Sequence, residues 1–393
     1  MTDPAVPFGN YQFEIYLAGL SGKLPDLPTS YASLEESARE KLSDEAFGYV
    51  AGGAGEEITV RANRAAFDRW RIVPRMLVDV SERDLRASVL GLEMPAPVML
   101  APVGVMSIVH DEAELAVARA ARELGLPMVL SNAASTTMED VASELGDSPR
   151  WFQLYWPTDN ELAASFVSRA KDAGYSAIVV TLDTRMLAWR PRDLARAYLP
   201  FLKGQGVANY LKDPVFRAAL DKSPEDDLQA AIGHWATLFA NPGLSWDDLA
   251  FLQAHTDLPI VLKGVLHPDD ARKAVDAGVD GLIVSNHGGR QVDGAVGALE
   301  ALPDVVDAVP DDFPVLFDSG IRTGADVLKA LALGARAVLV GRPYVWGLAL
   351  GGEDGVKQVL RSLLADFDLT LALSGYTKPS DVGQQALRRT ESL

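Results

Sequence analysis

The chain has 393 residues, of which 48% are hydrophobic, so it is long enough for two domains or for one large barrel with insertions. Its formal net charge of -18 at pH 7 argues against nucleic acid and against anionic membrane surfaces as partners. It contains no cysteine, which excludes disulfides, thiolate metal sites and a cysteine nucleophile.

Residues 1–94 form the first predicted region, a helical extension that packs on the rest of the chain. Helical stretches occur in it, including residues 33–49. The extension shows no basic region followed by an apolar run, and no apolar stretch of the chain is long enough to cross a bilayer. We therefore expect a cytoplasmic protein without a membrane partner.

Residues 95–376 repeat one pattern, in which a short apolar strand ends in small or polar residues and an amphipathic helical stretch follows. The clearest helical stretches are 112–124, 161–173, 268–277 and 324–333. Eight such units predict an α/β fold of the (β/α)8, or TIM-barrel, type, whose strands are apolar throughout because both of their faces are covered. An open doubly wound sheet is the alternative, but no GxGxxG motif follows an early strand. The predicted strands are residues 97–101, 127–131, 152–155, 177–181, 259–263, 281–285, 313–318 and 337–341.

The connection after the fourth strand, about residues 185–245, is far longer than a usual strand-to-helix loop. Parts of it have a helical pattern and parts do not. Long loops over a barrel mouth are often lids, and a subunit contact is the other interpretation. The last residues, 377–393, are expected to form a C-terminal tail beyond the barrel.

The segment SNHGGR, residues 285–290, follows the sixth strand and carries a histidine and an arginine three positions apart. Active sites of such barrels form at the C-terminal ends of the strands. The imidazole of His287 can take a proton near neutral pH, and the guanidinium of Arg290 can hold a carboxylate through two parallel hydrogen bonds. The pair suggests proton abstraction from a small carboxylic acid. A helix-capping loop with a surface arginine is the alternative.

The ends of the last two strands each combine a glycine with an arginine, Gly320 with Arg322 and Gly341 with Arg342. Bare backbone N–H groups beside a guanidinium form the common phosphate site of these barrels. Other strand ends offer Ser, Gln, Thr and Lys side chains, which suit the heteroatom edge of a planar ring. Together they predict a mononucleotide cofactor, with FMN as the best candidate. Ordinary glycine turns, or a phosphate-binding isomerase without redox chemistry, would fit the glycine–arginine pairs alone. No His or carboxylate spacing predicts a metal site.

Several segments together resemble the FMN-dependent 2-hydroxy acid oxidising family, which includes glycolate oxidase, lactate oxidase and mandelate dehydrogenase. The resemblance runs from about residue 31 to residue 376 and is carried by SNHGGRQVDG, DSGIRTGADVLKALALGARAVLVGRP, QLYWPTD and VTLDT. Within the family, the bacterial lactate 2-monooxygenases are most similar in the segments EIYLAGL, PTSYASLEE, YVAGGAGEE, DTRMLAWRPRDL and NYLKDPVF.

The resemblance implies a role for each strand-end residue. His287 is the expected base, and Asp183 is the carboxylate that hydrogen-bonds it and stabilises its protonated form. Lys263 is expected beside the N1–C2 edge of the flavin, and Tyr155 near the substrate hydroxyl. The expected catalytic residues are therefore His287, Asp183, Tyr155 and Lys263. On the residues alone, Asp183 fits a strand-end cap equally well, and a core tyrosine is the better interpretation of Tyr49. The expected substrate-binding residues are Tyr49, Tyr155, Arg190, Arg290 and His287. The expected FMN-binding residues are Pro102, Val103, Gly104, Ser131, Gln153, Tyr155, Thr181, Lys263, Ser285, Asp318, Gly320, Arg322, Gly341 and Arg342.

The activity implied by the resemblance is oxidation of an L-2-hydroxy acid, with O2 as the second substrate. His287 would remove either the hydroxyl proton or the α-proton. Lactate 2-monooxygenases convert lactate and O2 to acetate, CO2 and water, whereas oxidases release the 2-keto acid and H2O2. Ala133 and Gly104 stand where relatives carry larger side chains, which predicts a wider pocket and leaves room for an acid larger than lactate. The resemblance also implies a homo-oligomer, either a tetramer or an octamer.

Overall fold

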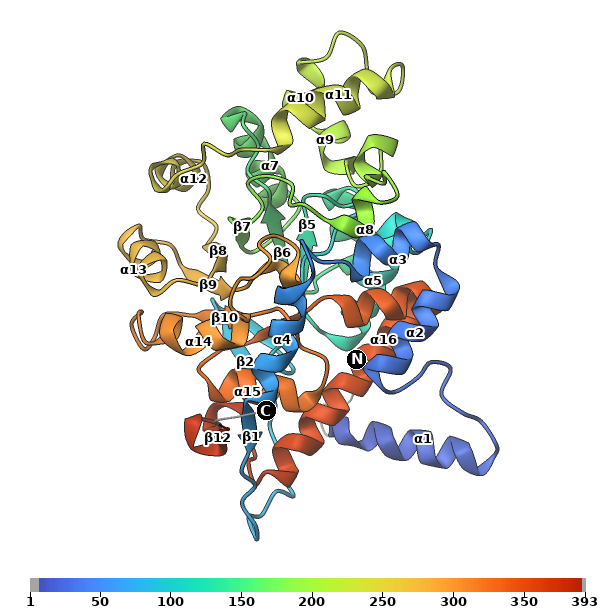
Figure 1. Ribbon diagram of the computed structural model, residues 1–393, viewed down its shortest axis with the longest axis vertical. Helices are drawn as coiled ribbons and strands as arrows, with labels where there is room; N and C mark the ends of the chain where they lie inside the picture. The colour runs from blue at the N-terminus through green and yellow to red at the C-terminus, as the bar shows by residue number, and fades with distance from the viewer. Residues whose placement is uncertain (1–6, 391–393) are drawn as a thin grey trace.

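Eight parallel strands close into a barrel at the centre of the molecule (Figure 1). The structure is a computed structural model that describes residues 7–390. Around the barrel the strands follow the order β10-β11-β4-β5-β6-β7-β8-β9, so β11 pairs with β4 and closes the ring. The predicted (β/α)8 fold and all eight predicted strands are confirmed. The bounds are β4 Val98–Leu100, β5 Met128–Ser131, β6 Arg150–Leu154, β7 Ile178–Thr181, β8 Ile260–Val265, β9 Gly281–Val284, β10 Val315–Phe317 and β11 Val338–Val340.

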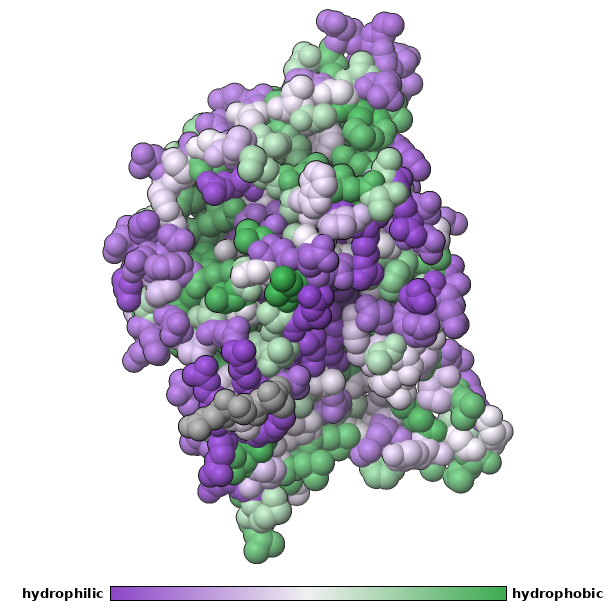
Figure 2. All heavy atoms as spheres, in the orientation of Figure 1, coloured by the Kyte–Doolittle hydropathy of each residue, from purple (hydrophilic) through white to green (hydrophobic). Residues whose placement is uncertain are grey.

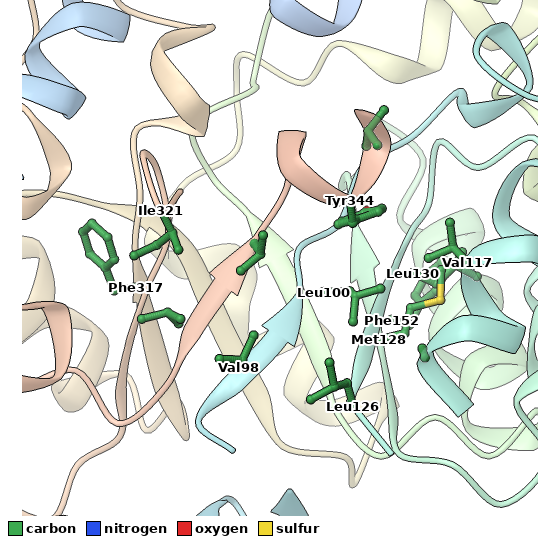
Figure 3. Close-up of a cluster of buried hydrophobic side chains, with 14 of the residues drawn as sticks. Val98, Leu100, Val117, Leu126, Met128, Leu130, Phe152, Phe317, Ile321 and Tyr344 are labelled. Carbon is green, nitrogen blue, oxygen red and sulfur yellow. The ribbon is translucent and has the colours of Figure 1, made fainter. Parts of the chain in front are cut away.

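Side chains that alternate along these strands build two cores. One set, including Met99, Val129 and Ile283, packs inside the barrel. The other set, including Leu100 and Phe152, packs beneath the surrounding helices (Figure 3). Because both faces of every strand are buried, the strands are apolar without alternation, and polar residues collect at their ends.

Helices cover the outside of the barrel, and the four that the sequence predicts most clearly are present. They are α5 Ala113–Leu124, α7 Asn160–Asp172, α13 Pro268–Asp276 and α15 Gly324–Ala332. In three of them a side chain that accepts from otherwise free backbone N–H groups fixes the start of the helix: Asp159 for α7, His267 for α13 and Thr323 for α15. The remaining outer helices are α6 Met138–Leu145, α12 Leu249–His255, α14 Ala298–Val306 and the long α16 Arg342–Leu373.

Residues 7–94 of the N-terminal extension contain four α-helices, α1 Tyr11–Leu20, α2 Tyr31–Lys41, α3 Asp44–Ala51 and α4 Ile58–Asp68. The helical stretch predicted over residues 33–49 is therefore two helices. Leu42 is extended, and the Ser43 hydroxyl accepts a hydrogen bond from the Ala46 N–H at 3.2 Å, so a second helix begins after it. α2 packs on α16, whereas α1 projects from the body of the molecule (Figure 1).

Two small antiparallel sheets lie outside the barrel ring. The hairpin of β2 Ala87–Val89 and β3 Leu92–Met94 precedes β4, and its Val89 and Met94 join the core inside the barrel. It therefore closes the N-terminal end of the barrel. β1 Trp70–Ile72 pairs with β12 Leu387–Arg389, which attaches residues 377–390 to the N-terminal extension.

The insertion after β7 folds into the short helices α8 Pro191–Leu194, α9 Ala208–Lys212 and α10 Pro214–Ala218, followed by α11 Leu228–Phe239. Buried polar contacts fasten it to the barrel. The Asn209 side chain accepts from the Met138 N–H at 2.8 Å, and Asp213 pairs with Arg169 at 2.9 Å. Within residues 7–390, no helix is both long and apolar enough to cross a membrane.

Candidate active site

A cavity opens at the C-terminal ends of the barrel strands and contains about 1080 Å³ of empty space, part of it continuous with solvent. Most of the predicted site residues line it, although they come from the N-terminal extension, the insertion and six strand ends. Those residues are Tyr49, Pro102, Val103, Gly104, Tyr155, Arg190, Lys263, His287, Arg290, Asp318, Gly320, Arg322, Gly341 and Arg342.

His287 stands between a carboxylate and a phenol. Its Nδ1–H donates to Asp183 Oδ1 at 2.8 Å, and its Nε2 lies 3.5 Å from the hydroxyl of Tyr155. The hydroxyl of Thr184 also donates to Asp183 Oδ1, at 3.1 Å. Because Nδ1 is engaged by Asp183, Nε2 is the nitrogen that is free to take a proton.

The electrostatics of this pair favour a neutral imidazole beside an ionised carboxylate. Burial lowers the pKa of His287, although Asp183 opposes the shift. Burial alone would raise the pKa of Asp183, but its hydrogen bond with His287 and the charge of Lys263 keep that pKa below the usual range. A neutral His287 is the form that could act as a base, and Asp183 is placed to stabilise the charge that it would gain.

The lowered pKa of His287 gives a pH prediction. The base must be neutral to take a proton, so kcat/KM stays high above the ordinary histidine pKa and falls as the pH drops through the lowered value. We expect an acidic limb with an apparent pKa below 6.5 in rapid-mixing measurements with substrate. An acidic limb above 6.5 would contradict this assignment.

The backbone around His287 explains the two glycines of the motif. His287 has a left-handed φ of 58°, followed by Gly288 at 65° and Gly289 at 78°. A Cβ on Gly289 would lie 2.7 Å from the backbone nitrogen of Val60 in α4, so no other residue fits this approach. The unusual conformation of His287 is typical of a residue that the surrounding structure holds for function.

Two arginines lie beside the base. Arg190 donates from Nε to the Arg290 carbonyl at 3.1 Å, and Arg290 donates to the Gly52 carbonyl at 2.8 Å while its guanidinium covers the Tyr49 ring at 5.1 Å. Within residues 7–390, no carboxylate forms an ion pair with either arginine. Burial, and then the neighbouring Arg190, lower the pKa of Arg290. This pair of cations is therefore suited to binding an anion.

A buried ion pair occupies the floor of the cavity. Lys263 Nζ donates to Ser285 Oγ at 2.9 Å and lies 3.1 Å from Asp318 Oδ2. Burial by itself lowers the pKa of Lys263, but Asp318 and Asp183 raise it above the usual value, so the ammonium stays charged. Ser285 Oγ also accepts from the His287 N–H at 3.0 Å, which connects the lysine to the segment that carries His287.

Five predicted residues lie just behind the cavity surface. Asp183 is behind His287, and the other four are buried at strand ends: Ser131, Gln153, Thr181 and Ser285. Ser131 donates to Gln153 Oε1 at 2.9 Å, which leaves Gln153 Nε2 buried without a hydrogen-bond partner among residues 7–390. A buried donor of this kind needs an acceptor from a bound molecule.

The glycine–arginine pairs differ in their contacts. Arg342 donates to the carbonyls of Val50, Gly288 and Gly52 at 3.0 Å each, so part of its guanidinium holds the chain around the site. Arg322 lies over the Tyr31 ring at 4.1 Å and donates to the Ile321 carbonyl at 2.8 Å. Arg342 is the first residue of α16, whose dipole adds to the positive potential there, and Arg322 lines the same cavity from the end of β10.

Sequence reasoning missed several residues that line the cavity. Ser319 lies between two predicted residues, and its hydroxyl donates to Asp318 Oδ1 at 2.8 Å and accepts from the Gly288 N–H at 3.0 Å. Its position inside the DSGIR motif was the available signal. Leu187, Phe201 and Phe239 come from the insertion, where no periodic pattern indicates which side chains reach the cavity.

Comparison with known proteins gives a consistent result over nearly the whole chain. Residues 38–389 match the family model of the FMN-dependent dehydrogenases. An FMN-dependent alpha-hydroxy acid dehydrogenase of Penicillium citrinum is 47% identical over 390 residues, covering 98% of this chain and 97% of the relative. L-lactate oxidase of Lysinibacillus sphaericus is 44% identical over 364 residues, with 93% of each chain covered. A crystal structure of mandelate oxidase matches with a TM-score of 0.81 and 41% identity, covering 92% of this chain and 98% of that one.

The chain belongs to the FMN-dependent dehydrogenase family. It is accordingly an FMN-dependent oxidoreductase of 2-hydroxy acids. The predicted cofactor is confirmed by this membership, and the flavin supplies the two-electron acceptor for the oxidation. A non-redox isomerase is no longer a suitable interpretation of the phosphate site.

The residues of this FMN-dependent dehydrogenase fit its cofactor. The free Gln153 Nε2 and the Lys263 ammonium supply buried donors for ring heteroatoms. Arg322, Arg342 and the start of α16 supply positive potential for a phosphate. Within residues 7–390, no group of three or more His, Asp or Glu residues is placed to hold a metal ion.

For this family member, Lys263→Met predicts a loss of cofactor affinity. The substitution leaves Asp318 buried without its cation, and it removes a donor from the ring site. We expect the Kd for FMN, measured by fluorescence titration of the apoprotein, to rise about tenfold or more, since an unpaired buried group costs about 1–3 kcal/mol. Lys273→Met, at an exposed position on α13, should bind FMN like the parent. Equal affinities in all three proteins would contradict the role of Lys263.

Proposed function

We propose that this protein oxidises an L-2-hydroxy acid at His287 and acts as a lactate 2-monooxygenase, converting lactate and O2 to acetate, CO2 and water. The observation that carries the oxidation step is the placement of Arg190 and Arg290 beside His287, whose pKa is lowered, while neither arginine pairs with a carboxylate of residues 7–390. Arg190 and Arg290 would hold the substrate carboxylate, and Nε2 of His287 would then face the carbon that carries the hydroxyl.

The chain's own residues would act in sequence around the bound acid. Tyr49 and Tyr155 would orient the carboxylate and the hydroxyl, because both phenols border the cavity and burial raises the pKa of each, which keeps them protonated as donors. His287 Nε2 would take the proton, and Asp183 would stabilise the resulting imidazolium through Nδ1. The flavin would accept the electrons.

The covering of the cavity supports the monooxygenase outcome. A keto acid that stays bound can be decarboxylated by peroxide inside the site, so slow release of the product favours that outcome over simple oxidation. Phe201 and Phe239 of the insertion line the cavity, and Phe239 packs on Tyr155 with 5.4 Å between ring centroids. Phe201 stacks on Trp235 at 4.9 Å, which fixes this apolar cover from behind.

A second candidate is an oxidase that releases the 2-keto acid and H2O2 from a larger acid. Ala133 leaves space on one wall of the cavity, and the mandelate oxidase with which the structure matches has been crystallised with benzoyl-formic acid. Gly104 is a weaker argument for a wide pocket. A Cβ at Gly104 would lie 2.5 Å from the Ala133 carbonyl oxygen, so the close approach of two loops also requires glycine there.

A product assay tests the proposal. Anaerobic lactate should bleach the flavin absorbance, and aerobic turnover should then yield acetate and CO2 in amounts equal to the lactate consumed. Pyruvate with an equal amount of H2O2 would instead support the oxidase. If lactate fails to bleach the flavin and mandelate succeeds, the larger acid is the substrate.

We also propose that the protein assembles with copies of itself. α1 has no buried residue, and Phe13, Tyr16, Leu17 and Leu20 are each more than half exposed. Hydrophobic surface shows on this projecting part of the molecule in Figure 2. A helix of ten residues is marginal without tertiary contacts, so a covering partner would stabilise it. Light scattering should give a mass several times 42.2 kDa, and Leu17→Lys should reduce it.

A further inference from the structure

Glu114 is a fully buried carboxyl group that the proposed reaction does not use. It is the second residue of α5, with 0% of its surface exposed. Oε1 accepts hydrogen bonds from the Met106 N–H at 3.3 Å and from the Ser135 N–H at 3.0 Å. Burial raises the pKa of this carboxyl group. One oxygen atom thus joins the loop after β4 to the loop after β5.

Both loops form the wall of the cavity. Residues 101–105 of the first loop all line it, and so does Ala133 of the second. The loops also contact each other directly, since the Val105 N–H donates to the Ala133 carbonyl at 2.9 Å and the Ser135 hydroxyl donates to that of Ser107 at 2.9 Å. At its start the first loop is held by Tyr344, whose hydroxyl donates to the Ala101 carbonyl at 2.8 Å. Glu114 holds the other end.

Stabilisation of α5 alone does not explain this carboxyl group. An acidic side chain in the first turn of a helix can interact with the helix dipole while it remains exposed to water. It then avoids the free-energy cost of burying a carboxyl group. Glu114 is instead buried and directed at two segments outside its own helix. Val105, between these contacts, has a left-handed φ of 61°, so the first loop adopts a conformation that neighbouring contacts must maintain.

We propose that Glu114 is a positioning residue that fixes the spacing of the two loops, and thereby the shape of the wall against which the flavin and the substrate side chain lie. The part that concerns substrate choice rests on the proposed oxidation of a 2-hydroxy acid. The spacing of the loops and the affinity for FMN can be measured without turnover. The positioning role of Glu114 and the proposed oxidation can therefore fail independently of each other.

The test compares three variants of the full-length FMN-loaded protein. Glu114→Asp retracts the acceptor by one methylene, whereas Glu114→Gln keeps an oxygen at the same reach. Glu123→Gln is the control, because Glu123 lies on α5 but is exposed and pairs with Lys357. Hydrogen–deuterium exchange of peptides covering 101–107 and 132–137 reports on the loops. The Kd for FMN and the ratio of kcat/KM for mandelate to that for lactate report on the shape of the cavity wall that the two loops form.

In Glu114→Asp we expect faster exchange in both peptides, an FMN Kd raised about tenfold, and a changed substrate ratio, because small displacements at a reacting site have effects of up to about a hundredfold. Glu114→Gln and Glu123→Gln should resemble the parent in every measurement. Unchanged exchange and FMN affinity in Glu114→Asp would overturn the proposal. So would a Glu114→Gln variant as impaired as Glu114→Asp, or a Glu114→Asp variant that fails to fold, since either result would assign Glu114 to the stability of the barrel.

Discussion

Replacing His287 with glutamine is expected to slow reduction of the flavin by substrate by about 10²–10⁴-fold, the range that a positioned general base contributes. Glutamine is similar in size and can still donate to Asp183, which His287 contacts at 2.8 Å. It has no nitrogen that takes a proton at neutral pH. The loss should therefore appear in the reduction step, measured by anaerobic stopped-flow absorbance, while the protein keeps its FMN.

The control for this variant is His255→Gln, because His255 lies exposed at the end of α12. It should reduce the flavin at the rate of the parent. A His287→Gln protein that is fully loaded with FMN and reduced at nearly the parental rate would remove His287 from the role of base. Loss of FMN from the variant would instead indicate that the segment 285–290 was displaced.

Arg290→Met is expected to weaken binding of the substrate carboxylate and so to lower kcat/KM, which is the second large effect. Removing one partner of a buried charge pair costs about 2–5 kcal/mol, which corresponds to a fall in kcat/KM of about 30-fold to several thousandfold. Arg290 is buried beside Arg190 and the Tyr49 ring, so no solvent cation replaces it. The kcat/KM of Arg290→Lys should lie between those of Arg290→Met and the parent, since lysine keeps the charge but not the planar guanidinium.

Arg196→Met is a suitable comparison, because Arg196 pairs with Asp44 at the surface and is partly exposed. Its kcat/KM should equal that of the parent. The decisive comparison uses a substrate amide, which lacks the carboxylate charge. Arg290→Met should lose activity on the acid but little on the amide, and equal losses on both would show that the arginine serves the structure and not the carboxylate.

The sequence predicted the barrel well because its strands are buried on both faces. Continuous apolar runs such as residues 281–284 and 337–341 stand out from the amphipathic helices between them. Polar residues at the strand ends then had to meet at one mouth, which is why Lys263, His287 and Asp318 could be expected together before any distance was known. The positions of these three side chains in one cavity follow from topology alone.

What the sequence could not supply were contacts between segments distant along the chain. The pairing of Arg290 and Arg342 with carbonyls of residues 49–52 depends on how α3 packs on the barrel, and no periodic pattern encodes that packing. The cavity-lining residues of the insertion could not be predicted either, since irregular turns bring Phe201 and Phe239 to the cavity. The break at Ser43 was readable in principle as a serine before an acidic first turn, but the helical pattern on both sides concealed it.

The carbonyls at the end of α3 also bear on how such a protein can be inherited or engineered. Arg290 and Arg342 belong to the barrel, yet the acceptors for their N–H groups belong to Tyr49, Val50 and Gly52. A barrel without this segment would lose the acceptors that hold both guanidinium groups in place. The segment at the end of α3 is thus part of the site. Because its acceptors are backbone carbonyls, the segment of a relative should replace it wherever that segment holds its own carbonyls at the same positions.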